Sequence, residues 1–257
     1  MKIVTFNLRT ENGRDGLNAF ENRRGFIIDR LEAHDADIIG FQEITPGMND
    51  FLRTHMDKYT LVGCGRNANY LGEHNPVAFK KDRFELIGLD VSWLSETPFV
   101  PGSRFPVQSS CPRIITHTIL RPLGDGAPFH FYNTHLDHVS SEARVQGATQ
   151  LLNKMREDQK THPFPLILTG DFNAEPDKPE IRMFTADPLG LTDQSNGVGT
   201  TWHGYGTSFG PRIDYIFTRG FTAESEATLW TEQLGGLYLS DHYAVEILLH
   251  REDGGTL

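Results

Sequence analysis

The chain has 257 residues, of which 38% are hydrophobic and 11% aromatic, and this composition excludes a disordered protein. Its 34 acidic and 24 basic side chains give a formal net charge of −10 at pH 7. A negative balance of this size argues against a non-specific nucleic-acid binder, because such binding depends on cationic contacts with phosphates, although a local phosphate site stays open.

Short β-type runs alternate along the chain with fewer helical ones, and Gly, Pro, Asn or Asp bounds each run. The predicted strands, in chain order, cover residues 2–8, 38–42, 77–80, 84–89, 113–120, 129–135, 166–169, 213–217 and 244–249. Apolar residues at helical spacing predict helices over residues 18–34, 141–159 and 177–185. Because strands outnumber helices and hairpin-like stretches mix with βα units, the pattern favours a layered α/β fold with mixed sheets.

No feature of the sequence divides this pattern into separate domains. It contains no repeat of solenoid period, no low-complexity tract and no linker rich in Pro and Ser. The loop 195–211 carries five glycines, but it is too short to separate two domains, and we expect it at the surface, where loops often carry function. We therefore predict one domain over residues 1–257.

The two cysteines, Cys64 and Cys111, are too few for a disulfide scaffold or a cysteine-rich zinc site, and we expect two buried thiols. No apolar stretch approaches the roughly 18 residues needed to cross a membrane. The N-terminus leads from Lys2 directly into an apolar β-type run, without the longer apolar region and cleavage site of a signal peptide. These features predict a cytoplasmic protein that contacts no membrane.

Polar residues able to bind metal or move protons stand at or near the ends of six predicted strands. They are Asn7, Glu43, His135, Asp171 with Asn173, Asp214, and Asp241 with His242. Taken singly, such residues are more often caps, turn formers or hydrogen-bonded structural histidines. Taken together, they predict one site, provided that the strand ends converge on one rim of the fold.

Asp214 is the hardest of these residues to explain as purely structural, because it lies inside the apolar run 212–216. A buried carboxylate without a partner is costly in free energy. The candidate partner is His242, and we predict that the two side chains form a pair.

The ordered set of motifs resembles the successive signatures of the endonuclease/exonuclease/phosphatase superfamily, and it spans residues 5 to 242. The motifs are Thr5-Phe6-Asn7, Phe41-Gln42-Glu43, Asn133-Thr134-His135-Leu136-Asp137, Thr169-Gly170-Asp171-Phe172-Asn173, Arg212-Ile213-Asp214-Tyr215-Ile216 and Ser240-Asp241-His242. Further stretches resemble a bacterial subgroup: Asp15-Gly16-Leu17-Asn18, Gly72-Glu73-His74-Asn75-Pro76, Trp93-Leu94-Ser95-Glu96-Thr97-Pro98 and Thr201-Trp202-His203-Gly204. The resemblance implies a four-layer α/β sandwich, with two mixed β-sheets packed face to face and flanked by helices, and hydrolysis of phosphoester bonds with a divalent metal.

The resemblance also implies the metal site and its ion. Glu43 and Asn7 match the family's metal-binding positions, and Asp241 is either a third acid near the metal or a support for the histidine beside it. The expected cofactor is Mg²⁺, with Mn²⁺ as a substitute, because a hard cation prefers oxygen ligands.

The remaining candidates are assigned to the phosphate and to the attacking water. Asp171 is the general base, Asn173 holds a phosphoryl oxygen through its amide, and His242 with Asp214 stabilises the phosphoryl group or donates to it. His135 and Arg113 are candidate phosphate donors. For Arg113, a surface charge near the start of a strand is an equal alternative.

Two residues of the glycine-rich loop are candidates for contacts with the rest of the substrate. Trp202 and His203 are placed to line the pocket and to stack on a ring or sugar. Trp93 is a weaker candidate, because a tryptophan in an apolar strand is more often part of the core.

These residues predict an enzyme that cleaves phosphodiester or phosphomonoester bonds by in-line attack of water. The expected substrate is a small molecule or a single-stranded nucleic acid, with no duplex, membrane or protein partner. The alternatives are a nuclease for single-stranded DNA or RNA and a non-catalytic binding module. Leu8 and Arg9 follow Asn7 without the acid that abasic-site endonucleases of this family carry nearby, which weakens a role in DNA repair. Hydrolysis of lipid phosphodiesters, as in the family's sphingomyelinases, stays open, but no basic amphipathic segment favours it.

Overall fold

Two mixed β-sheets lie at the centre of the fold, and the computed structural model describes residues 1–124 and 126–252. The first sheet has the order β11-β15-β1-β2-β4-β3, with β12 also paired to β15, and β1 runs parallel to β2. Its strands are β1 (Lys2–Asn7), β2 (Ile38–Gln42), β3 (Tyr59–Val62), β4 (Val77–Lys80), β11 (Phe221–Ala223), β12 (Thr228–Leu229) and β15 (Val245–Arg251).

The second sheet has the order β5-β6-β7-β8-β10-β9, and only β7 and β8 in it run parallel among the described pairs. Its strands are β5 (Phe84–Trp93), β6 (Ile114–Pro122), β7 (Phe129–His135), β8 (Leu166–Asp171), β9 (Thr192–Asp193) and β10 (Asp214–Arg219). A separate small hairpin consists of β13 (Gln233–Leu234) and β14 (Leu237–Tyr238).

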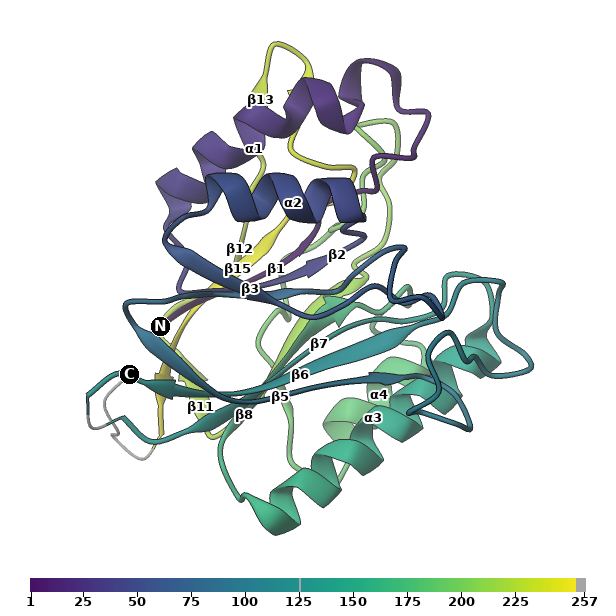
Figure 1. Ribbon diagram of the computed structural model, residues 1–257, viewed down its shortest axis with the longest axis vertical. Coiled ribbons are helices and arrows are strands. Elements are labelled where there is room, and N and C mark those ends of the chain that lie inside the picture. Colours follow the sequence, from purple (N-terminus) through teal and green to yellow (C-terminus); the bar gives the residue numbers. More distant parts are fainter. Residues whose placement is uncertain (125, 253–257) are drawn as a thin grey trace.

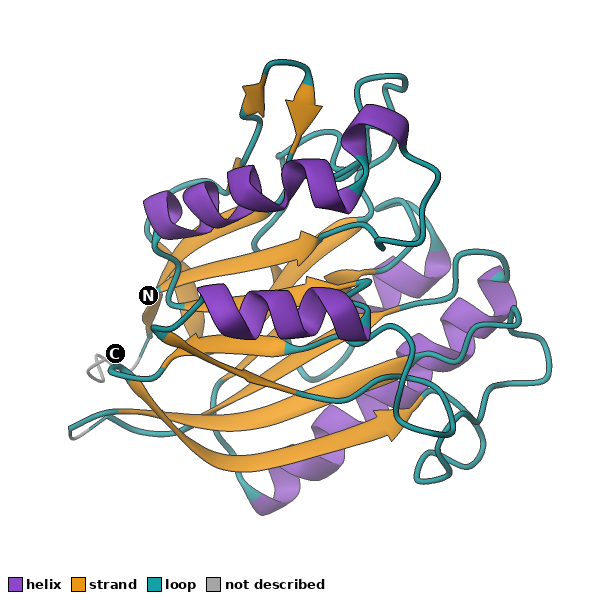
Figure 2. Cartoon of the chain, turned by 45° about the horizontal axis from the view of Figure 1, so that its top comes forward, coloured by secondary structure: helices purple, strands orange, loops and turns teal. Residues whose placement is uncertain are grey.

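Helices cover the outer face of each sheet, which gives four layers (Figures 1 and 2). A short 3-10 helix, η1 (Gly16–Asn18), leads into α1 (Phe20–His34), which covers the first sheet with α2 (Pro46–His55). The second sheet is covered by α3 (Ser141–Thr161) and α4 (Pro179–Ala186). None of the helices in the described ranges has both the length and the apolar character needed to span a membrane.

Side chains along the central strands alternate between the helix-facing side and the space between the sheets. In β1, Val4 and Phe6 pack with α1 and α2, whereas Ile3 packs against the other sheet. In β8, Leu168 packs with α3 and α4, and Ile167 packs between the sheets. Full burial of one such side chain contributes about 1.5–3 kcal/mol. Apolar residues on both faces are therefore what holds the four layers together.

The predicted sandwich of two mixed sheets flanked by helices is confirmed. All nine predicted strands and all three predicted helices form, mostly within two residues of the expected bounds, but β5 continues to Trp93 instead of ending at residue 89. Trp93 is 3% exposed and its indole N–H donates to the carbonyl of Arg66 at 2.6 Å, so it belongs to the core. The prediction of two buried thiols is wrong, because Cys64 and Cys111 are both half-buried.

The sequence pattern does not predict α2, β3 or the strands of two or three residues, all of which the structure contains. For α2 the start signals are present: Thr45 accepts a hydrogen bond from the Met48 N–H at 3.3 Å, and Pro46 occupies the first turn. The helix is short, and only Met48 and Leu52 are buried on it, so few apolar positions mark it in the sequence. Of the shortest strands, β9, β11 and β12 form beside longer strands, and β13 and β14 pair with each other, which a local pattern does not reveal.

Near the carboxyl ends of the strands, the space between the sheets becomes polar. The amide nitrogen of Asn133 donates to the carbonyl of Phe41 at 2.7 Å, and its Oδ1 accepts from Gln42 at 2.8 Å and from Thr169 at 3.0 Å. Gly40 lies against this network, and a Cβ atom there would come within 2.2 Å of Thr169 Oγ1. We call these five residues the polar seam. It lets the two sheets approach closely beside the pocket described below.

We expect Gly40→Ala to lower the free energy of unfolding by about 2–4 kcal/mol, because the added methyl group displaces Thr169 and Asn133 and breaks buried hydrogen bonds. Urea unfolding followed by circular dichroism measures the change. The control is Gly25→Ala on α1, where a Cβ meets no atom within 4 Å outside its own helix backbone. The control should be neutral or stabilising by up to about 1 kcal/mol. Equal stability of the two variants would contradict the role given to Gly40.

Candidate active site

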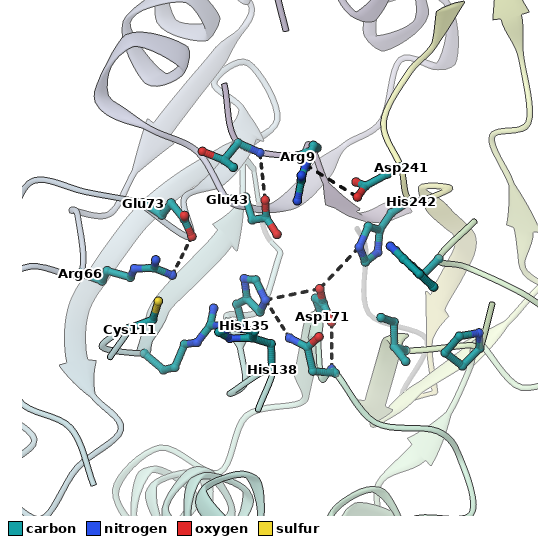
Figure 3. A pocket seen from close by; sticks show the side chains of 16 residues that line it. Arg9, Glu43, Arg66, Glu73, Cys111, His135, His138, Asp171, Asp241 and His242 are labelled. Carbon is teal, nitrogen blue, oxygen red and sulfur yellow. Dashed lines mark hydrogen bonds and ion pairs between the residues drawn. The ribbon is translucent and has the colours of Figure 1, made fainter. Parts of the chain in front are cut away.

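A pocket of about 500 Å³ opens at the rim where β2, β7 and β8 end (Figure 3). It is lined by Arg9, Thr10, Glu43, Arg66, Glu73, Cys111, Arg113, His135, His138, Asp171, Asn173, Trp202, Pro211, Ile213, Asp241 and His242. Eight of the eleven predicted site residues are in this lining, and the other three are Asn7, Asp214 and His203. The structure therefore brings strand ends from both sheets to one rim.

The side-chain amide of Asn7 links a carboxylate of the first sheet to one of the second. Its nitrogen donates to Glu43 Oε1 at 3.1 Å and to Asp171 Oδ2 at 2.9 Å. Its oxygen accepts the N–H of Arg9 at 3.0 Å, which fixes the direction of the amide. Asn7 is fully buried; its bond to Asp171 is buried and its bond to Glu43 is partly buried, and hydrogen bonds to charged groups contribute about 1.5–3 kcal/mol each.

Three residues around the pocket have a left-handed backbone: Arg9 at φ 57°, Glu43 at φ 64° and Asn173 at φ 49°. This conformation costs about 1–3 kcal/mol for a residue other than glycine and is often found at functional sites. Local hydrogen bonds hold two of them in place. The Thr10 N–H donates to Glu43 Oε2, and the Asn173 N–H donates to Asp171 Oδ1, each at 2.9 Å.

The environment keeps Glu43 ionised although it is half-buried. Burial alone would raise the pKa of Glu43, but the hydrogen bonds from Thr10 and Asn7 and the charges of His242 and Arg9 outweigh it and lower that pKa. A carboxylate binds a metal ion in its deprotonated form, and an ionised Glu43 meets this requirement.

His242 and Asp214 form the predicted pair. His242 Nδ1 lies 2.9 Å from Asp214 Oδ2, and both side chains are buried. Burial would lower the pKa of His242, but the adjacent carboxylates of Asp214, Asp171 and Asp241 reverse this effect and raise it to about 10. The ring is therefore an imidazolium at neutral pH, and Nε2 is the nitrogen that is directed away from Asp214.

Asp171 lies between these groups at the floor of the pocket. Burial and the negative charge of Asp214 raise the pKa of Asp171 to about 7, against the opposing effects of His242 and of the hydrogen bonds from Asn173 and Asn7. A carboxyl group with a raised pKa accepts a proton more readily than an ordinary aspartate.

His135 is held as a neutral ring beside Asp171. Its Nε2 lies 2.9 Å from the side-chain nitrogen of Asn173 and 3.4 Å from Asp171 Oδ2. Burial and then the positive charges of Arg113 and Arg66 hold the pKa of His135 well below its ordinary value. The same nitrogen of Asn173 also donates to the carbonyl of Leu136 at 3.1 Å. In this geometry both N–H bonds of the Asn173 amide are used within the protein.

Arg113 lies inside the pocket and not at the surface, so the alternative of a surface charge is excluded. The side chain is 4% exposed, and its Nη2 contacts His138 Nδ1 at 2.9 Å. Its Nε and Nη1 are buried without a hydrogen-bond partner among the described residues. Buried donors left without acceptors are costly, and a ligand with oxygen atoms in the pocket would satisfy them.

The glycine-rich loop holds the segment that carries Asp241 and His242 by its backbone. Trp202 forms an isolated β-bridge with His242 and lines the pocket. The N–H groups of His203 and Gly204 donate to the carbonyl of Asp241 at 2.9 and 3.1 Å. Asp241 itself lines the pocket with its carboxylate 3.8 Å from Arg9 Nε.

The structure does not bring the His203 ring to this pocket, contrary to the expected stacking on substrate. His203 is 3% exposed and stacks on the ring of Tyr243, with centroids 3.9 Å apart. Its Nδ1 accepts the N–H of Gly206 at 3.1 Å. The ring packs inside the loop because the turn at Gly204–Gly206 folds back over it, so its contribution to the pocket is the backbone contact to Asp241.

Two sets of side chains have the chemistry to hold a divalent cation. One is the predicted set, with Glu43 as its ionised carboxylate; Asn7 would offer its oxygen only with its amide turned over. The other is Asp171, Asp214 and His242, whose ligand atoms lie within 4.8 Å of one another. Mg²⁺ prefers oxygen ligands. Because the second set includes a protonated imidazole, the carboxylate of Glu43 fits a hard cation better.

Eight residues of the pocket lining are absent from the predicted site: Arg9, Thr10, Arg66, Glu73, Cys111, His138, Pro211 and Ile213. Arg9 makes a two-pronged ion pair with Asp15, at 3.1 Å for each bond, and Arg66 Nη1 lies 2.6 Å from Glu73 Oε2. The available signals were the stretches that contain Asp15 and Glu73, which resemble the bacterial subgroup, and the position of His138 one residue after a family motif.

Known proteins that are similar to this chain bear on the family predicted from the motifs. A model of the Endonuclease/Exonuclease/phosphatase family matches residues 4–242. The chain belongs to this family. The family predicted from the motifs is thus confirmed, and the endonuclease/exonuclease/phosphatase proteins are hydrolases of phosphoester bonds.

Individual members of the endonuclease/exonuclease/phosphatase family are similar in structure over the whole chain. The family protein from Bacteroides vulgatus has a TM-score of 0.91 at 29% identity and covers 98% of both chains. Mannosyl-6-phosphatase from Bacteroides thetaiotaomicron has a TM-score of 0.87 at 28% identity, covering 97% of this chain and 99% of that one. A protein of Acanthamoeba polyphaga mimivirus named "Uncharacterized protein L388" is 30% identical over 167 residues, which are 61% of this chain and 60% of the viral protein.

The Asp214–His242 pair predicts a specific titration. A raised pKa means that the ring keeps its proton as the pH rises past 6.5, so without added divalent cation we expect a protonated His242 and a neutral His135 at pH 7.5. Asp214→Asn removes the main charge that raises the pKa and should lower it by about 1–3 units. Nitrogen NMR of the labelled rings measures the protonation states at pH 7.5 and the change in the pKa of His242. A His242 ring that titrates near 6.5 with and without Asp214 would refute the pairing.

Proposed function

We propose that the protein hydrolyses phosphoester bonds of a small phosphorylated substrate with the help of Mg²⁺ or Mn²⁺. The observation that carries this proposal is the buried amide of Asn7, which holds Glu43 and Asp171 on one nitrogen at the pocket floor. One of these carboxylates is held ionised and the other has a raised pKa. A metal ligand and a proton acceptor side by side are what metal-assisted hydrolysis by water requires.

In the proposed reaction each side chain acts on the phosphoryl group or on the water. Asp171 takes a proton from the attacking water, whose oxygen bonds to phosphorus in line with the departing oxygen. His242 donates a hydrogen bond from its free Nε2–H to a phosphoryl oxygen, and Asp214 keeps the ring charged and oriented. Arg113 offers to the same charge its Nε and Nη1 donors, which make no hydrogen bond among the described residues.

The cation is assigned to Glu43, with Asp241 as a further carboxylate at the same side of the pocket. When bound, it would neutralise negative charge on the phosphoryl oxygens. Asn173 and His135 lie beside Asp171 and complete the polar surface around the phosphate. Asn7 is a metal ligand in this proposal only if its amide turns over, and otherwise it positions the two carboxylates.

A small substrate is favoured over a nucleic acid by the charges at the pocket. The chain carries a net charge of −10, and each of the three arginines that line the pocket lies within 4.0 Å of a carboxylate. A strand of DNA or RNA needs a row of free cations along its backbone. The name mannosyl-6-phosphatase of a relative with 28% identity also supports a small phosphate ester. A nuclease for single strands is the second candidate, and the shared family is what favours it.

We expect Asp171→Asn to lower kcat/KM for phenyl phosphate and for bis(p-nitrophenyl) phosphate at least about 100-fold with Mg²⁺, because the variant loses the proton acceptor. Release of phosphate or nitrophenol measures the rate. Asp29→Asn, on the exposed side of α1, is the matched control and should keep the wild-type rate. Wild-type activity of Asp171→Asn would exclude Asp171 as the base. Cleavage of a single-stranded oligonucleotide in preference to the small esters would favour the nuclease.

Cation binding separates the enzyme from a non-catalytic binding module. We expect calorimetry to detect Mg²⁺ or Mn²⁺ binding to the wild-type protein and at least about ten-fold weaker binding to Glu43→Gln, since the variant lacks the ionised ligand. Circular dichroism checks that the variant is folded. If neither protein bound a divalent cation, the metal-dependent mechanism would be refuted and the binding module favoured.

A further inference from the structure

The pocket continues past the catalytic groups toward an ion pair that the proposed mechanism does not use. Arg66 and Glu73 are 14% and 19% exposed in their side chains and line the end of the pocket away from His242 (Figure 3). The loop that carries them is tied down at several points. The backbone N–H of Arg66 donates to the carbonyl of Glu73 at 3.0 Å, and the carbonyl of Arg66 accepts from the Trp93 indole at 2.6 Å. The ion pair is therefore a fixed wall of the pocket.

The same ion pair borders a second hollow of about 410 Å³. Its lining is Glu11, Asn12, Thr45, Pro46, Gly47, Arg66, Asn67, Gly72 and Glu73. Since Arg66 and Glu73 belong to both linings, the two hollows meet at this pair. A substrate whose phosphate lies at Asp171 and His242 has room to extend over the pair and into the second hollow.

The side chains that line the second hollow determine which chemical group can bind there. The second hollow offers carboxylate, amide and hydroxyl groups, and its described lining includes no aromatic ring and no cation apart from the paired Arg66. Such a surface has nothing to neutralise a phosphate backbone and nothing to stack on a base or bury an acyl chain. A hydroxyl group both donates and accepts, so it suits a wall of mixed charge and neutral amides.

An unsatisfied donor stands at the junction of the catalytic centre and the ion pair. Arg113 is 4% exposed, lines the same pocket as Arg66 and has two buried nitrogens, Nε and Nη1, that make no hydrogen bond among the described residues; its Nε lies 4.0 Å from Asp137 Oδ1. A ligand oxygen there would satisfy these donors, whether it belongs to the phosphate or to a neighbouring hydroxyl. The pocket thus contains hydrogen-bond donors for a polar ligand in addition to an open volume.

We infer that Arg66, Glu73 and Asn67 form a hydroxyl-binding subsite, and that the group released from the phosphate is polyhydroxylated, a saccharide or a similar polyol. This inference rests on the proposed function, because it places the scissile phosphate at Asp171 and His242. Glu73 accepts hydrogen bonds from substrate hydroxyls, Arg66 donates to their oxygens, and Asn67 does both at the entrance of the second hollow. A site built to bind hydroxyl groups rejects analogues that lack them.

The test compares glucose 6-phosphate with phenyl phosphate, which has the same reacting group and no hydroxyl groups. Wild-type protein should prefer glucose 6-phosphate in kcat/KM, and Glu73→Gln and Asn67→Ala should each lower the ratio of the two values at least about ten-fold. Asn67 is exposed, so its variant is expected to fold even if Glu73→Gln does not. The control is Glu32→Gln on the exposed face of α1, which should keep the wild-type ratio. Wild-type ratios in both subsite variants, or a preference of the wild-type protein for phenyl phosphate, would overturn the inference.

A binding measurement separates this inference from the proposed function. Asp171→Asn, which should not turn over substrate, is titrated with glucose 6-phosphate by calorimetry, alone and combined with Glu73→Gln. Glu73-dependent binding in a protein that hydrolyses no phosphate ester would keep the subsite and overturn the proposed function. Hydrolysis of both esters together with binding that does not depend on Glu73 would keep the proposed function and overturn the subsite.

Discussion

One buried amide group determines how the two halves of the site meet. Asn7 is the last residue of β1 in the first sheet, and its nitrogen holds a carboxylate from each sheet, Glu43 and Asp171. The two acids would repel one another if they were simply placed together in a medium of low polarity. The shared donor offsets part of this repulsion, and the polar seam behind it fixes the distance between the sheets. The pocket is therefore as rigid as the packing of one sheet on the other.

The same burial sets the protonation of the site. His242, His135 and Asp171 all lose contact with water, yet their pKa values move in different directions because their neighbours differ. His242 faces carboxylates and keeps its proton, whereas His135 faces arginines and loses it. Two histidines of one pocket thus serve as a cation and as a neutral ring. The two rings differ in protonation because carboxylates lie beside His242 and arginines lie beside His135.

Most of the fold and the centre of the site could be predicted from the sequence, because both depend on local patterns. Apolar runs of strand length mark the sheets, and Glu43 and Asp171 stand at the ends of such runs whereas His242 stands shortly before one, so converging strand ends bring them together. The outer wall could not be predicted in this way. Arg66 and Glu73 are isolated charges in a loop, and only their pairing across a turn distinguishes them from solvated residues. His203 is the opposite case. Its motif predicts a ring that lines the pocket, but the ring packs inside the loop.

The pairing of β1 with β15 has a consequence for how the molecule forms. Lys2 lies opposite Leu248, so β1 acquires one of its two neighbours only after the residues between these two strands have been made. Contacts between such distant positions form late, and until then the apolar edge of β1 has no partner and can pair with other chains. His242 arrives with the same terminal segment. A chain interrupted during synthesis therefore lacks both its complete sheet and its imidazolium, and it is at its most aggregation-prone before it has any chemistry to perform.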